Sequence, residues 1–104
     1  TQSRSSAASD VYKRQDNIDK DFGMLFIWDK EEIQCIWMKN TSIPLSIAFI
    51  KEEGVISDIY NLYPFSTLSV CSTDKVKYAL EVNRGWFKEN EITRGDTVIS
   101  SQIK

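Results

Sequence analysis

Short apolar runs separated by turn residues begin near residue 22 and continue to the end of the chain. They are five to eight residues long and rich in β-branched and aromatic side chains, which is typical of β-strands. Six strands are predicted, at residues 24–28, 34–38, 45–51, 55–61, 76–83 and 97–103. Six strands with little helix predict a single, mainly β domain, a small sandwich or barrel.

The clearest unit is a hairpin made of residues 45–51 and 55–61. Its loop is Glu52-Glu53-Gly54, and we expect Gly54 to have a positive φ. The continuous apolar run at 24–28 suits a strand buried on both faces, and the charged residues 29–32 after it predict a turn.

The segment 34–42 is predicted to form a strand and then a turn. Cys35 and Trp37 share one face of the strand and Ile36 lies on the other. We expect Trp37 in the core and Asn40 in the turn, because asparagine tolerates left-handed φ. Residues 62–74 are predicted to form a long surface loop, and residues 85–90 one helical turn too short to stand alone.

The first fifteen residues, TQSRSSAASDVYKRQ, have no apolar period of either kind. Their last six, DVYKRQ, match the translation of a transposase adaptor used in sequencing libraries, with codons GAT GTG TAT AAG AGA CAG. We expect residues 1–15 to be a non-native disordered tail and residues 16–104 to be the domain. The alternative is a natural disordered tail with a short basic patch.

Composition excludes several functions. Histidine is absent, which rules out a serine or cysteine nucleophile activated by histidine within the chain. Cys35 and Cys71 lie in no CxxC spacing, so no metal site or cofactor is expected; two separate thiols are predicted, with a disulfide left as the alternative. No apolar run approaches the length of a transmembrane helix, and no signal peptide is visible.

Charge also limits the partners. Residues 16–104 carry 14 acidic and 10 basic side chains, a net charge of −4. No basic stripe accompanies this balance, so the domain as a whole is a poor candidate for binding nucleic acid or anionic lipid.

Three segments together resemble a known family: GMLF at 23–26, WMKNTSIPL at 37–45 and YALEVNRGW at 78–86. In this order and spacing the chain resembles the domain of unknown function 192 family, which is widespread in prokaryotes. The resemblance implies a compact β-sandwich of jelly-roll-like character, in a family whose members are often exported. It therefore implies an extracytoplasmic location, in the periplasm or cell envelope, and brings no established activity.

Two departures from the family pattern stand out. Members carry an opening strand and a helical stretch with a Gly-Leu-Met motif before GMLF, where this chain has the adaptor-like tail. We therefore expect an N-terminally truncated copy with an exposed sheet edge through which it self-associates. Where the family usually has aspartate after IPL, this chain has Ser46.

The candidate ligand-binding residues are Lys39, Asn40, Thr41, Glu81 and Trp86. A lysine near a carboxylate in a pocket can bind a polar ligand or share a proton. The structural alternative is that Asn40 and Thr41 shape a turn while Lys39 and Glu81 pair or face water. Among the aromatic residues, which are mostly needed to fill the core, Trp86 is the best candidate for stacking on a sugar.

The sequence favours a non-enzymatic accessory domain outside the cytoplasm that binds a small molecule or carbohydrate. No recognisable nucleophile–base pair is present. The alternative is a hydrolase or sugar-active enzyme that uses Glu81 with Lys39 or Asp96.

Overall fold

The computed structural model describes residues 23–98. The predicted tail and the end of the predicted last strand lie outside this range. The elements are β1 (Gly23–Glu32), β2 (Cys35–Ile36), β3 (Leu45–Ile50), β4 (Ile56–Leu62), β5 (Val70–Cys71), β6 (Val76–Asn83) and α2 (Trp86–Glu89). The prediction of a mainly β domain with one short helical turn is confirmed.

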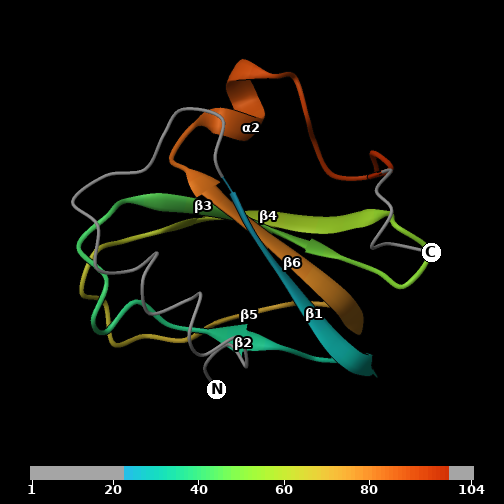
Figure 1. Ribbon diagram of the computed structural model, residues 1–104, viewed down its shortest axis with the longest axis horizontal. Helices are drawn as coiled ribbons and strands as arrows, with labels where there is room; N and C mark the ends of the chain where they lie inside the picture. The colour runs from blue at the N-terminus through green and yellow to red at the C-terminus, as the bar shows by residue number, and fades with distance from the viewer. Residues whose placement is uncertain (1–22, 99–104) are drawn as a thin grey trace.

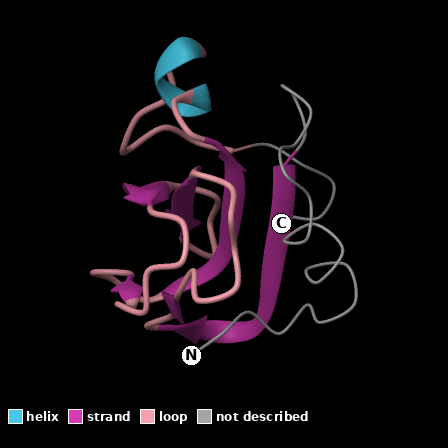
Figure 2. Cartoon of the chain, turned by 90° about the vertical axis from the view of Figure 1, so that its left-hand side faces the viewer, coloured by secondary structure: helices cyan, strands magenta, loops and turns pink. Residues whose placement is uncertain are grey.

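The strands form two separate antiparallel sheets rather than a closed barrel. The larger sheet has the order β1-β6-β3-β4, and the smaller one pairs β2 with β5. Figure 1 shows the small sheet on one side of the large sheet and α2 on the other, and Figure 2 shows the same arrangement turned by 90°. The result is a sandwich-like fold in which no described helix is long and apolar enough to cross a membrane.

The large sheet buries side chains on both faces. On the inner face, which we define as the face toward β2 and β5, Leu45, Ile47 and Phe49 pack with Ile36. On the outer face, toward α2, Ala48 and Ile50 pack with Phe87 and other apolar residues. All six residues of β3 are buried, because β3 lies between β6 and β4 and both of its faces are covered.

Strand β1 differs from the prediction in two ways. It continues through residues 29–32, which were expected to form a turn, with an irregular register between Ile27 and Glu32. It is also fully covered on one face only: Met24, Phe26 and Trp28 are buried, whereas on the other face Leu25 is partly buried against the outer core and Ile27 is 47% exposed. Residues of an edge strand alternate between buried and more exposed positions in this way. The expectation that residues 24–28 are buried on both faces is therefore wrong.

The β3–β4 hairpin has the predicted loop, and Gly54 has a φ of 95° as expected. The last predicted strand is represented in the described residues by a single bridge between Val55 and Thr97. This bridge joins the segment after α2 to Val55, the residue before β4.

The Trp37 prediction needs correction. Ile36 and Met38 are buried in the inner core, whereas Trp37 is half-buried. The alternation along this segment was correct, but the face assigned to the core was the wrong one. Asn40 does lie in a turn, within the 37–44 connection between β2 and β3.

The prediction that Cys35 and Cys71 are separate thiols is also wrong. The two residues are directly opposite each other on β2 and β5, with their Cα atoms 4.0 Å apart, and they form a disulfide. The pairing was missed because β5 lies within residues 62–74, which were expected to form a loop without strands. Two cysteines facing each other across an antiparallel ladder are within bridging distance.

Candidate functional site

The five predicted ligand-binding residues do not form one cluster. Lys39 and Asn40 are exposed in the turn after β2. Thr41 and Glu81 are buried, at 1% and 0% exposure. Trp86 lies on the outer side of the sheet at the start of α2.

Glu81 occupies the middle of the large sheet. It is in register with Met24 of β1 and with Ile47 of β3. Leu80 and Val82, its neighbours in sequence, pack in the outer core, so strand alternation places the Glu81 side chain on the inner face. A carboxylate buried this deeply carries a large desolvation cost and is unusual for a residue without a defined role.

The turn that carries Lys39 is tied to neighbouring segments. The Lys39 ammonium lies 5.5 Å from the centre of the Trp37 ring. The Thr41 N–H donates to the Met38 carbonyl, and the Thr41 carbonyl accepts from the Phe65 N–H. Asn40 and Thr41 therefore shape a turn, as the structural alternative proposed.

Thr41 offers a test of whether this turn is purely structural. Its Oγ1 is buried and has no hydrogen-bond partner. Because an unsatisfied buried hydroxyl costs about 1–3 kcal/mol, Thr41→Val should raise the free energy of unfolding by about 1 kcal/mol. Urea denaturation measures this change. A loss of stability would contradict the conclusion that this hydroxyl is unsatisfied.

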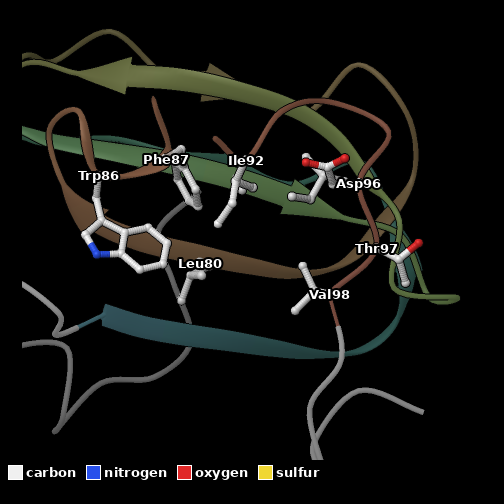
Figure 3. Close-up of a pocket in the computed structure, with 9 residues that line it drawn as sticks. Leu80, Trp86, Phe87, Ile92, Asp96, Thr97 and Val98 are labelled. Carbon is white, nitrogen blue, oxygen red and sulfur yellow. The ribbon is translucent and has the colours of Figure 1, made fainter. Parts of the chain in front are cut away.

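A pocket of ≈ 380 Å³ lies on the outer face of the large sheet (Figure 3). Its floor is formed by apolar side chains of β3, β4 and β6, and its walls by α2 and the segment after it. The lining residues are Ala48, Ile56, Leu80, Trp86, Phe87, Ile92, Asp96, Thr97 and Val98.

Trp86 and Asp96 stand at opposite ends of this pocket (Figure 3). Trp86 is half-buried and lies edge-on to Phe87, with ring centres 5.6 Å apart. Gly85, with a φ of 88°, allows the sharp exit from β6 that brings Trp86 over the sheet. The pocket therefore has an aromatic wall at one end and a carboxylate at the other.

Asp96 is fixed by its own turn. One carboxylate oxygen accepts a hydrogen bond from the Thr93 N–H at 2.8 Å, and the Asp96 carbonyl accepts one from the Ile56 N–H at 2.9 Å. The second carboxylate oxygen can accept a bond from a hydroxyl or amino group in the pocket.

Ser46, where the family pattern has aspartate, also belongs to the outer side of the sheet. It is 3% exposed. Its hydroxyl donates to Asn61 Oδ1 at 3.3 Å and accepts from the Gly85 N–H at 3.2 Å. In this chain the Ser46 hydroxyl therefore stabilises the turn at Gly85, which leads from β6 to Trp86.

One of the carboxylate pairs considered from sequence, Glu81 with Asp96, does not meet in one site. The Glu81 side chain points to the inner face, whereas Asp96 lines the outer-face pocket. Lys39 is exposed in its turn. Within residues 23–98, no group of three or more His, Cys, Asp or Glu side chains could hold a metal ion. The outer-face pocket combines apolar surface with one oriented carboxylate, that of Asp96.

Trp86 and Asp96 were both singled out from the sequence, whereas the apolar lining of the pocket was not. Ile92 and Val98 come from the segment after α2, which folds back over the sheet. A signal for this was present at Ile92, which is an isolated apolar residue in a polar stretch, whereas Val98 belonged to the predicted last strand at 97–103.

The chain is thus a small sandwich-like domain with a ligand-sized pocket beside a short helix. Residues 11–100 match the family described as uncharacterized ACR, domain of unknown function 192. The chain belongs to this family, as the three sequence segments indicated. No curated protein is significantly similar to it.

Two solved structures are similar to the chain. One is a protein of Sinorhizobium meliloti described as a candidate transcription regulator, with 38% identity and a TM-score of 0.76; the match covers 83% of this chain and 66% of that protein. The other is a protein of unknown function from Novosphingobium aromaticivorans, with 24% identity and a TM-score of 0.82; the match covers 91% of this chain and 70% of that one. The second likeness concerns the fold alone.

Proposed function

We propose that this domain is a non-enzymatic binding module that acts outside the cytoplasm and holds a small ligand in the outer-face pocket. The observation that carries the proposal is the pocket itself, with Trp86 at one end and the Asp96 carboxylate at the other. Its volume of ≈ 380 Å³ is within the range of about 300–1,000 Å³ typical of small-molecule sites.

The lining favours one class of ligand. Leu80, Ile92 and Val98 offer apolar contact, and Trp86 offers a ring on which a flat or ring-shaped ligand can stack. Asp96 accepts a hydrogen bond from a hydroxyl or amino group. A sugar ring has both properties, an apolar face and hydroxyl groups on its edge, so a monosaccharide or short glycan fits this chemistry.

The disulfide supports the extracytoplasmic location. Disulfides persist in oxidising compartments such as the bacterial periplasm and are rare in the cytosol. Cys35 and Cys71 are bonded to each other, and no described cysteine is free. This agrees with the export that the family resemblance implies.

The description of the Sinorhizobium protein as a transcription regulator is not a reason to assign DNA binding here. Residues 16–104 have a net charge of −4. Binding to DNA relies on basic side chains that neutralise phosphates, and the charge balance of this domain is the opposite.

The pocket can be tested with one variant. The protein is first screened against a library of metabolites and glycans by thermal shift. For a compound that binds, Trp86→Ala should weaken the affinity about tenfold or more, because the stacking surface is lost. Isothermal titration calorimetry measures the change.

Two controls define the result. Trp86→Phe retains a ring and should keep most of the affinity, and Phe65→Ala removes an exposed ring outside the pocket and should change nothing. If Trp86→Ala binds as tightly as the wild type, the pocket is not the site. If a screened glycan is cleaved, the domain is an enzyme and the binding-module proposal is wrong.

A further inference from the structure

The loop between β4 and β5 exposes large apolar side chains. Tyr63, Phe65 and Leu68 are 60%, 62% and 77% exposed, the highest values among the large hydrophobic residues that the structure describes. We refer to residues 63–68 as the apolar loop. Three such side chains on six consecutive residues form a patch of the kind that marks an interaction surface.

The sequence around the apolar loop carries no charge. Residues 59–73 contain no Asp, Glu, Lys or Arg, although 27% of the chain is charged. Entry of this segment into an apolar or interfacial environment therefore requires no charged side chain to lose its water.

The loop is held in shape by the neighbouring 37–44 connection. The Phe65 N–H donates to the Thr41 carbonyl at 2.9 Å, and the Met38 N–H donates to the Ser66 carbonyl at 3.2 Å. Phe65 has a φ of 61°, a left-handed conformation that is unfavourable for a residue with a Cβ. Such strain persists where surrounding contacts impose it, and it often marks a functional position.

One cation contacts these side chains, and a second lies on the neighbouring 37–44 connection. The Arg84 guanidinium lies 4.5 Å from the centre of the Tyr63 ring, and its Nη2 donates to the Leu62 carbonyl at 2.7 Å. Lys39 is exposed two residues before Thr41, whose carbonyl accepts the hydrogen bond from the Phe65 N–H. The two loops lie side by side at the left of Figure 1.

We propose that the apolar loop inserts into the interfacial region of an anionic phospholipid bilayer, independently of the ligand pocket. Phe65 and Leu68 enter the boundary between headgroups and acyl chains, and Tyr63 lies at headgroup level, where aromatic rings with a polar end are favoured. Lys39 and Arg84 contact lipid phosphates at the same level.

Charge favours a lipid surface over a second copy of the chain. A two-fold dimer formed through this loop would bring the Lys39 and Arg84 side chains of both copies into one interface, where residues 59–73 offer no carboxylate to pair with them. An anionic bilayer instead supplies phosphates around the inserted side chains. The net charge of −4 over residues 16–104 opposes binding of the domain as a whole to an anionic surface, so the attraction is local: residues 59–73 contain no acidic side chain, Arg84 contacts Tyr63, and Lys39 lies on the connection bonded to the loop.

The test is co-sedimentation of the full chain with large unilamellar vesicles of phosphatidylglycerol and phosphatidylethanolamine in a 1:3 ratio. Phosphatidylcholine vesicles serve as the neutral comparison. The wild type should bind the anionic vesicles and bind the neutral ones about tenfold less. Phe65→Ser/Leu68→Ser should reduce binding to the anionic vesicles about tenfold or more.

The matched control is Ile27→Ser/Ile33→Ser, which removes two apolar residues that are 47% and 50% exposed outside the apolar loop. It should bind the vesicles like the wild type. Circular dichroism shows that both double variants are folded, and Lys39→Gln should weaken binding to anionic vesicles only.

Three outcomes would overturn the proposal. These are no vesicle binding by the wild type, equal losses in both double variants, or unchanged binding by Phe65→Ser/Leu68→Ser. A dimer seen by size-exclusion chromatography that disappears in Phe65→Ser/Leu68→Ser, without vesicle binding, would show that the loop is a protein interface instead.

Discussion

Removing the Cys35–Cys71 disulfide should lower the free energy of unfolding by about 4 kcal/mol. The bond joins residues separated by 36 positions, and closing a loop of this length restricts the unfolded chain by about that amount in the chain-entropy account. The total stability of a small domain is about 5–15 kcal/mol. A loss of this size is therefore expected to leave the domain marginally stable.

The local structure explains why the bond is important. β2 and β5 are two-residue strands, and a two-stranded ladder this short is not stable by itself. The disulfide joins these strands at Cys35 and Cys71, beside Ile36, which packs in the inner core. Without the bond, we expect the layer that covers the inner face to loosen first.

The measurement is urea denaturation of the oxidised wild type, the reduced wild type and Cys35→Ser/Cys71→Ser. The reduced protein and the double variant should share a midpoint well below that of the oxidised protein. A thiol assay on the folded oxidised protein should detect no free thiol. Two free thiols, or equal midpoints for all three samples, would contradict the disulfide.

The sequence predicted the large sheet well because local signals define its strands. The β3–β4 hairpin has two apolar runs and a loop with glycine at the position of positive φ, and all of these act over a few residues. The WMKNTSIPL and YALEVNRGW segments identified the family, which the match over residues 11–100 confirms.

The small sheet could not be predicted from local patterns. β5 consists of Val70 and Cys71 in a stretch of serine and threonine residues, and it is a strand only because β2 lies opposite. Two residues contain no period that a sequence pattern can show. Once β5 was missed, the disulfide was missed with it.

The candidate site was predicted in part for a similar reason. Trp86 and Asp96 were noted as residue types, but their meeting at one pocket depends on the path of the segment after α2 across the sheet. Glu81 was paired with Asp96 as a possibility, and only strand alternation in the folded sheet shows that they belong to opposite faces.

Phe49→Ala should cost about 3–5 kcal/mol, more than twice the cost of Trp37→Ala. Phe49 is fully buried on β3, the strand between β6 and β4, and its ring lies edge-on to Tyr60 with centres 6.1 Å apart. Truncating such a residue removes its buried surface and leaves a cavity that a central strand cannot close.

Trp37, although larger, should matter less to stability. It is half-buried, and its Nε1 is buried without a hydrogen-bond partner, so truncation removes a desolvation cost together with the packing. From sequence alone Trp37 was expected in the core, where its truncation would be among the most costly. Because the core lies on the side of Ile36 and Met38, truncating Trp37 should instead cost less than truncating a core residue.

Urea denaturation of Phe49→Ala, Trp37→Ala and Ile27→Ala compares the three positions. Ile27, 47% exposed on the edge strand β1, is the control and should change the free energy of unfolding by about 0.5 kcal/mol or less. If Phe49→Ala is too unstable to purify, Phe49→Leu should still be the least stable of the purified variants, since even a smaller cavity forms at a site that cannot collapse. A Trp37→Ala variant less stable than Phe49→Ala would show that the 37–44 connection, rather than β3, is the centre of the inner core.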